Sequence, residues 1–137
     1  MISKNIEDYI RAIYLLERKN GPVRSKDLVD YLNVRKSSVS EMVAKLRMSE
    51  MILHNHYSTI ALTKKGHDLA EKLTFKHRVI EAFLTKMLKR NKQEVHGEAH
   101  LLEHAFSDQS VNAIYNILGK PKTGVHGEEI PNIRHFQ

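Results

Sequence analysis

The stretch Ser25–Met48, SKDLVDYLNVRKSSVSEMVAKLRM, is the most informative about the fold of the N-terminal half. Apolar residues recur at helical spacing before residue 33 and again from residue 39, which predicts two helices. Only Asn33-Val34-Arg35 joins them, and Ser38 with Glu41 resembles a capping box for the second helix. Two short helices joined so tightly predict a helix-turn-helix whose recognition helix covers residues 36–49.

The segments on either side extend this to a winged helix. Upstream, Asn5 to Arg18 has the apolar spacing of an amphipathic helix. Downstream, Ile52 to Leu62 is rich in β-branched and aromatic residues, and polar residues 54–58 suit the tip of a hairpin. A helix-turn-helix followed by a hairpin predicts a winged helix over residues 1–65.

The C-terminal half predicts helices only. Thr63 is expected to cap a long helix that reaches Leu88, and two more helices are expected over 93–106 and 107–118. The fold class is therefore mostly α, with a winged helix-turn-helix domain, a helical domain over 66–119 and a poorly ordered tail over 120–137.

The charge is concentrated in the winged helix. The chain carries a net charge of +6, and residues 1–65 hold 12 Lys/Arg against 7 Asp/Glu. This balance favours a polyanion partner, most simply double-stranded DNA. A helix-turn-helix directs the start of its second helix at a major groove, and basic residues nearby contact phosphate. The DNA-binding candidates are Arg35, Lys36, Ser37, Ser38, Ser40, Glu41, Lys45, Lys64 and Lys65.

A second informative stretch, Val95–His104, reads VHGEAHLLEH. On a helix, His100, Glu103 and His104 share one face, with His96 one turn earlier. His77 and Glu81 form another pair four residues apart. Imidazole and carboxylate donors suit Mn, Fe, Co or Zn. The alternative is a solvated helix face, or core histidines bonded to backbone.

The remaining histidines are weaker ligand candidates. We expect His54 and His56 in the wing to be solvated or to contact phosphate, and His126 and His135 in the tail to be equally weak. There is no cysteine, which excludes disulfides and thiolate metal sites. No apolar run approaches the ~18 residues of a membrane span, and the N-terminus lacks a signal-peptide core. We therefore expect a cytoplasmic protein without a membrane partner.

Several short motifs resemble the diphtheria-toxin-repressor and manganese-transport-regulator family, in its short form without an SH3-like domain. They run in the family's order from about residue 5 to residue 118. These motifs are Glu7-Asp8-Tyr9-Ile10, Lys36-Ser37-Ser38-Val39-Ser40, Leu62-Thr63-Lys64-Lys65-Gly66, Lys76-His77-Arg78 and Glu103-His104. The resemblance implies a homodimeric, metal-activated repressor that binds operator DNA and controls manganese or iron homeostasis genes.

The resemblance also implies two metal sites. The primary site would use Asp8, His100, Glu103 and His104, and the ancillary site His77, Glu81 and His96. Asp8 is typical of manganese-type members, whereas His100 matches neither type, and Arg11 stands where manganese-type members add a carboxylate. The metal is therefore Mn(II) or Fe(II), for which Co(II), Ni(II) or Zn(II) can substitute.

Two other functions compete with this interpretation. One is a winged-helix regulator that senses an organic ligand and uses the histidines structurally. The other is a metalloenzyme, which needs an open coordination position and a general base. The sequence has no His-Glu-x-x-His motif, and we expect no enzyme activity.

Overall fold

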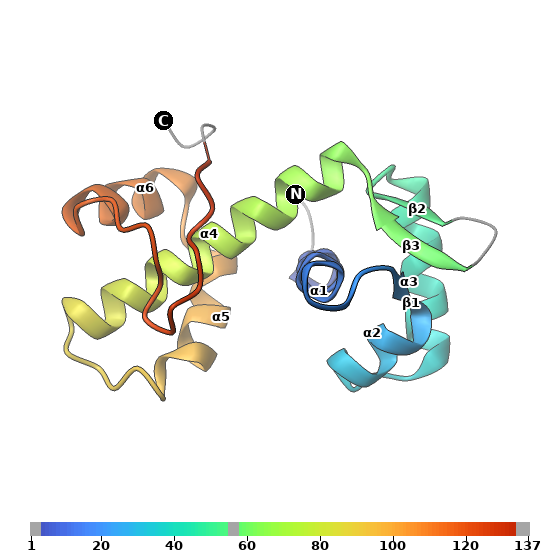
Figure 1. Cartoon of the computed structure of the whole chain (residues 1–137), viewed down its shortest axis with the longest axis horizontal. Helices are drawn as coiled ribbons and strands as arrows, with labels where there is room; N and C mark the ends of the chain where they lie inside the picture. The colour runs from blue at the N-terminus through green and yellow to red at the C-terminus, as the bar shows by residue number, and fades with distance from the viewer. Residues whose placement is uncertain (1–3, 55–57, 134–137) are drawn as a thin grey trace. The chain divides into compact units, whose positions relative to one another are not determined.

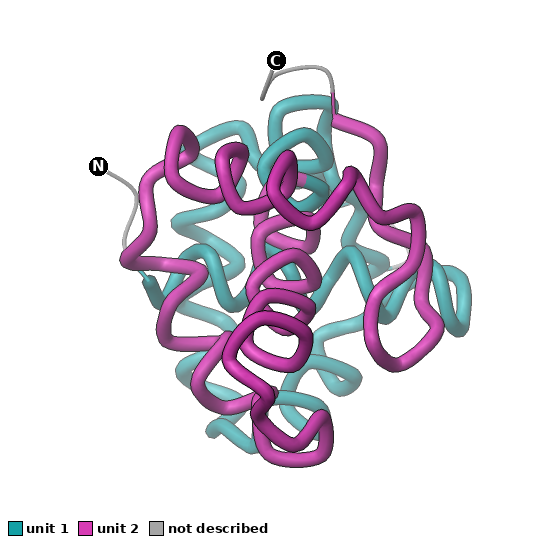
Figure 2. The backbone as a smooth tube through the Cα atoms, turned by 90° about the vertical axis from the view of Figure 1, so that its left-hand side faces the viewer, with its two compact units in different colours: residues 1–71 teal, residues 72–137 magenta. Residues whose placement is uncertain are grey.

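The computed structural model describes residues 4–54 and 58–133. The chain forms two compact units, residues 1–71 (unit 1) and residues 72–137 (unit 2), coloured separately in Figure 2. The division falls within the long helix α4 (Lys64–Lys86), whose first residues belong to unit 1. The sequence had suggested a boundary at residue 65, where α4 begins.

Unit 1 is a winged helix (Figure 1). Its elements, besides the start of α4, are α1 (Lys4–Asn20), β1 (Val23–Arg24), α2 (Ser25–Leu32), α3 (Lys36–Met48), β2 (Ile52–His54) and β3 (Thr59–Leu62). The strands form an antiparallel sheet in the order β1-β3-β2, with Val23 opposite Ile60 and Ile52 opposite Leu62. The sequence did not predict β1. The expected hairpin tip includes residues 55–57, which lie outside the described residues.

The helix-turn-helix is stabilised by a helix C-cap in the left-handed conformation and by a shared hydrophobic core. Asn33 ends α2 at φ 54°, a conformation that asparagine tolerates, and its N–H donates to Val29 O. The apolar positions that predicted the helices point inward and bury Leu28, Val39 and Leu46. Ile10 and Ile13 of α1 complete the same core. The period of 3.6 residues thus leaves one face of α3 for solvent.

The predicted capping box at Ser38 and Glu41 is wrong. Helix α3 begins at Lys36, with Arg35 as its cap residue, and no described side chain caps this end. Ser38 and Glu41 lie inside the first turns and are exposed. Val39 N already donates to Arg35 O at 3.1 Å, so Ser38 lies inside the first turn of the helix and cannot be its cap.

The start of α4 is fixed against the sheet. Thr63 Oγ1 accepts a hydrogen bond from Gly66 N at 3.1 Å, which confirms Thr63 as the cap. The Thr63 hydroxyl also donates to Glu50 O at 2.6 Å. A Cβ on Gly66 would lie 2.1 Å from Met51 O, so only glycine allows this close approach.

Unit 2 consists of the rest of α4, α5 (Val95–Ala105), α6 (Asp108–Ile117) and an irregular C-terminal segment. Its core includes Phe75, Val79 and Ile80 of α4. Ser107 Oγ accepts a hydrogen bond from Ser110 N at 3.1 Å, so Ser107 caps α6 as expected. None of the helices within the described residues combines the length and apolar character needed to cross a membrane.

Residues 120–133 are not a poorly ordered tail. Ile130 and Ile133 are buried in the core of unit 2, and Ile130 N donates to Lys122 O at 2.8 Å. Arg78 of α4 donates to Glu129 O. The prediction of a poorly ordered tail rested on the glycines, prolines and scattered charges of this segment. The segment is ordered because its two isoleucines pack into the apolar core of unit 2.

Candidate metal centre and nucleic-acid interface

The histidines and glutamates of unit 2 gather around three buried groups. His77, Glu81 and Glu103 are 2%, 3% and 0% exposed. Burying charged groups costs several kcal/mol unless they are paired or bind a metal. These three groups are therefore not part of a solvated helix face.

His77, Glu81 and His96 form the first group. His77 Nε2 lies 3.1 Å from His96 Nδ1 and 3.2 Å from Glu81 Oε1. One ligand atom from each residue lies within 4.8 Å of the others. Nitrogen and oxygen donors at this spacing surround a volume that suits a divalent ion with bonds of about 2.0–2.2 Å. The predicted ancillary set is thus brought together by α4 and α5.

The carboxyl group of Glu81 stays ionised despite its burial. Burial alone would raise the pKa of its carboxyl group, but the hydrogen bond from His77 and the charges of the neighbouring histidines hold it below its ordinary value. Glu81 is therefore a carboxylate at neutral pH, the form that binds cations.

His100, Glu103 and His104 form the second group, along α5. His100 Nδ1 lies 2.8 Å from Glu103 Oε1, and His104 Nε2 lies 3.7 Å from the same oxygen. The rings of His100 and His104 meet edge to face, with centroids 5.3 Å apart. The donor set fits a divalent metal. Asp8 belongs to α1 in unit 1, so its sharing of a metal with these three residues stays a prediction.

Glu103 also reaches the first group. Its Oε2 lies 3.5 Å from His77 Nδ1, while Nε2 of the same ring faces Glu81 and His96. At 3.5 Å this approach is longer than a normal hydrogen bond, so any support of the His77 ring by Glu103 would be electrostatic. The spacing along α5 gave no sign of this contact, since His77 is on another helix.

His126 was expected to be only a weak ligand candidate, in the C-terminal tail. Its Nε2 lies 3.2 Å from Glu81 Oε2. No helical or strand spacing relates residue 126 to residue 81, so the sequence carried no signal for this contact. Of the other weak candidates, His54 ends β2, whereas His56 and His135 lie outside the described residues.

Most of the DNA-binding candidates lie on the outer face of α3 or at its start. All seven between residues 35 and 45 are exposed, while Val39, Met42, Val43 and Leu46 face the core. Lys64 is exposed and lies 3.0 Å from Asp68 Oδ2. Lys65 Nζ donates to Ser49 O at 3.2 Å, at the end of α3, so Lys65 also supports the recognition helix. This basic helix face suits a polyanion.

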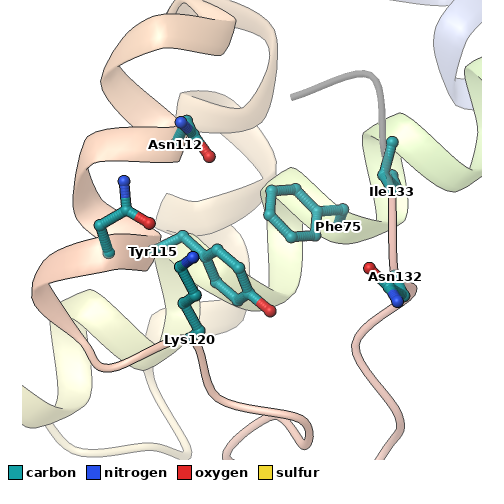
Figure 3. Close-up of a pocket in the computed structure, with 7 residues that line it drawn as sticks. Phe75, Asn112, Tyr115, Lys120, Asn132 and Ile133 are labelled. Atoms are coloured by element: carbon teal, nitrogen blue, oxygen red, sulfur yellow. The ribbon is translucent and has the colours of Figure 1, made fainter. Parts of the chain in front are cut away.

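A cavity of about 260 Å³ opens elsewhere on unit 2 (Figure 3). It is lined by Phe75, Asn112, Tyr115, Asn116, Lys120, Asn132 and Ile133, and by none of the metal-ligand candidates. Its volume is below the range of about 300–1,000 Å³ that is usual for organic ligands. It gives the organic-ligand alternative little support.

Fold and site together define a metal-responsive DNA-binding regulator, and comparison with known proteins agrees. Residues 1–60 match the model for the N-terminal DNA-binding domain of iron-dependent repressors. Residues 63–132 match the model for their metal-binding and dimerisation domain. The chain therefore belongs to the iron-dependent repressor family, a family of transcriptional regulators. This result confirms the resemblance seen in its motifs.

Two relatives illustrate the similarity. An uncharacterised HTH-type transcriptional regulator of Methanocaldococcus jannaschii is 34% identical over 125 residues, which cover 90% of this chain and 100% of that protein. The HTH-type transcriptional regulator MntR of Bacillus subtilis is 30% identical over 118 residues, which cover 86% of this chain and 82% of MntR.

Among solved structures, a manganese-dependent transcriptional repressor in complex with manganese superposes with a TM-score of 0.86 and 33% identity. The match covers 93% of this chain and 58% of that one, so this chain spans under two thirds of that structure's length.

Proposed function

We propose that the protein is a metal-activated repressor that binds operator DNA as a homodimer and controls genes of manganese or iron homeostasis. The observation that carries the proposal is the pairing of two features within one short chain. Unit 1 exposes a basic recognition helix, and unit 2 holds two groups of histidine and glutamate at ligand spacing. Such an arrangement suits a switch in which a metal controls DNA binding.

The trigger site in this proposal is Asp8 with His100, Glu103 and His104. Its support is the family resemblance and the gathering of the last three side chains on one face of α5. Because Asp8 belongs to unit 1, a metal bound to all four residues would restrict how the two units move. In a symmetric dimer, that would fix the spacing of two recognition helices to match two half-sites on DNA. The metal would thus select one member of an ensemble.

The ancillary site would be His77, Glu81 and His96. These residues belong to α4 and α5 of unit 2, so a metal there would order the helical unit without touching the winged helix. The oxygen and nitrogen donors can bind Mn(II) or Fe(II), and the descriptions of a solved relative and of the family model favour these two metals. Asp8 argues for Mn(II), whereas His100 departs from both known types.

The dimer surface would come from α5 and α6. Leu101 on α5 is 60% exposed and Ile117 on α6 is 69% exposed. Large apolar side chains on a surface often mark an interface. The metal-binding and dimerisation domain of the family covers both helices.

The test is a DNA-binding titration on duplexes selected from a random pool. With Mn(II) or Fe(II) we expect tight binding that is lost in chelator and that falls steeply with salt, because Lys and Arg contacts release counterions. Lys92→Ala, which removes an exposed charge from unit 2, is the control and should bind normally. Equal affinity with and without metal would refute the switch.

A further inference from the structure

We propose that Lys76 is a positioning residue of the trigger site, because it holds the end of α5 that carries Glu103 and His104. This inference rests on the proposed function, since it requires that these two residues bind the activating metal. It gives a role to a buried lysine that belongs neither to the metal ligands nor to the DNA-binding face. In this role Lys76 touches no metal and acts only through the backbone of α5.

The amino group of Lys76 is directed at the end of α5. Lys76 precedes His77 on α4 and is 7% exposed. Its Nζ donates a hydrogen bond to Phe106 O at 2.6 Å. Phe106 is the residue at which α5 ends, with an extended backbone at φ −73° and ψ 136°. The last carbonyls of a helix have no partner within that helix, so a donor from outside stabilises them. Lys76 therefore fixes the position of the end of α5 on α4.

The same amino group also reaches the start of α6. Lys76 Nζ lies 3.5 Å from Asp108 Oδ1, and Lys72, one turn earlier on α4, pairs with the other oxygen of that carboxylate. Only Phe106 and Ser107 separate α5 from α6, so both contacts of Lys76 hold one corner of unit 2 (Figure 1). The end of a helix carries partial negative charge, which a cation stabilises.

The trigger ligands lie much closer to this corner than the ancillary ligand on α5. His104 and Glu103 precede Phe106 by two and three residues. His96 precedes Phe106 by ten residues, which corresponds to about 15 Å along a helix. Functional side chains need to stay within about 0.5 Å of their working geometry. A loosened corner would therefore displace His104 and Glu103 and leave His96 close to His77.

The experiment compares the two sites in the full chain with Co(II), whose visible absorption reports the ligand set. A Glu81→Gln background isolates the trigger site, and a His104→Ala background isolates the ancillary site. Lys76→Met keeps the length of the side chain but removes the donor. We expect it to weaken Co(II) binding at the trigger site at least about tenfold and to change the absorption, with a much smaller loss at the ancillary site. Lys76→Gln, whose amide is one atom shorter, is a second variant and should act in the same direction.

Two controls separate positioning from general stability. Lys72→Met removes an amino group that pairs with Asp108 but keeps the bond from Lys76 to Phe106 O, so both sites should bind Co(II) normally. Val111→Ala removes buried volume from α6 and should lower the free energy of unfolding in urea without changing the absorption of the trigger site. If Lys76→Met and Lys76→Gln lost no more trigger affinity than Val111→Ala, the positioning role of Lys76 would be overturned.

Two further outcomes identify which contact and which site are at fault. If Asp108→Asn lost as much trigger affinity as Lys76→Met, the ion pair would be responsible and not the bond to Phe106 O, which would also overturn the proposal. If His104→Ala in the Glu81→Gln background left Co(II) binding unchanged, the trigger site of the proposed function would be wrong. Loss of binding in that variant beside normal binding in Lys76→Met would overturn the role of Lys76 alone.

Discussion

Replacing Glu103 with glutamine keeps the volume of the side chain but removes the charge of a fully buried carboxylate. Glu103 lies 2.8 Å from His100 through Oε1 and 3.5 Å from His77 through Oε2. It is thus expected to act as a ligand at the trigger site and as the support of a ligand at the ancillary site. Glu103→Gln should therefore weaken both sites, but by different amounts.

The structure sets the order of the two effects. At the trigger site the substitution removes an anionic ligand, so the loss should be at least the 10–100-fold that follows from perturbing a metal's supporting shell. At the ancillary site only the carboxylate behind His77 is lost, at the long distance of 3.5 Å. There we expect about tenfold, which corresponds to about 1.4 kcal/mol of binding free energy.

Calorimetric titration with Mn(II) measures both losses. The trigger site is measured in a Glu81→Gln background, and the ancillary site in a His104→Ala background. Glu98→Gln is the matched control, because Glu98 lies on the same helix and pairs at 2.7 Å with the exposed Arg90. If Glu103→Gln changed ancillary affinity no more than Glu98→Gln does, the support of His77 by Glu103 would be refuted.

Other substitutions address the remaining parts of the argument. Asp8→Ala should spare part of the metal binding by calorimetry yet uncouple it from DNA binding, and a variant that switched normally would exclude a bridging metal. If Arg35 reads a base, Arg35→Ala should cost about 1–3 kcal/mol of binding free energy on the selected duplex and little on random DNA. Lys64→Ala should weaken binding to both duplexes alike. Equal losses of affinity on both duplexes for Arg35→Ala would rule out base reading. Gly66→Ala should lower the free energy of unfolding in urea by about 1–3 kcal/mol, because its Cβ would meet Met51 O at 2.1 Å, and an unchanged midpoint would contradict that contact.

Features that depend on residues close together in the chain could be predicted from the sequence alone. Helical periodicity predicted α3 and its exposed basic face, and spacings of three and four residues predicted that His100, Glu103 and His104 share one face of α5. The Thr63 and Ser107 caps were also readable, because a capping bond joins residues only three positions apart. The family resemblance added the assignment of these residues to metal and DNA.

The side chains that meet from different helices became known only from the way in which the helices pack. The approach of His96 on α5 to His77 on α4, and the burial of Glu103 behind His77, depend on how the two helices pack. The segment that carries His126 is held on unit 2 by the buried Ile130 and Ile133. Periodicity describes one helix at a time, whereas packing joins residues far apart in the sequence, such as His126 and Glu81, which are 45 positions apart. The apolar side chains that drive this packing do not identify their partners in the sequence, so the contacts between helices could be found only in the folded chain.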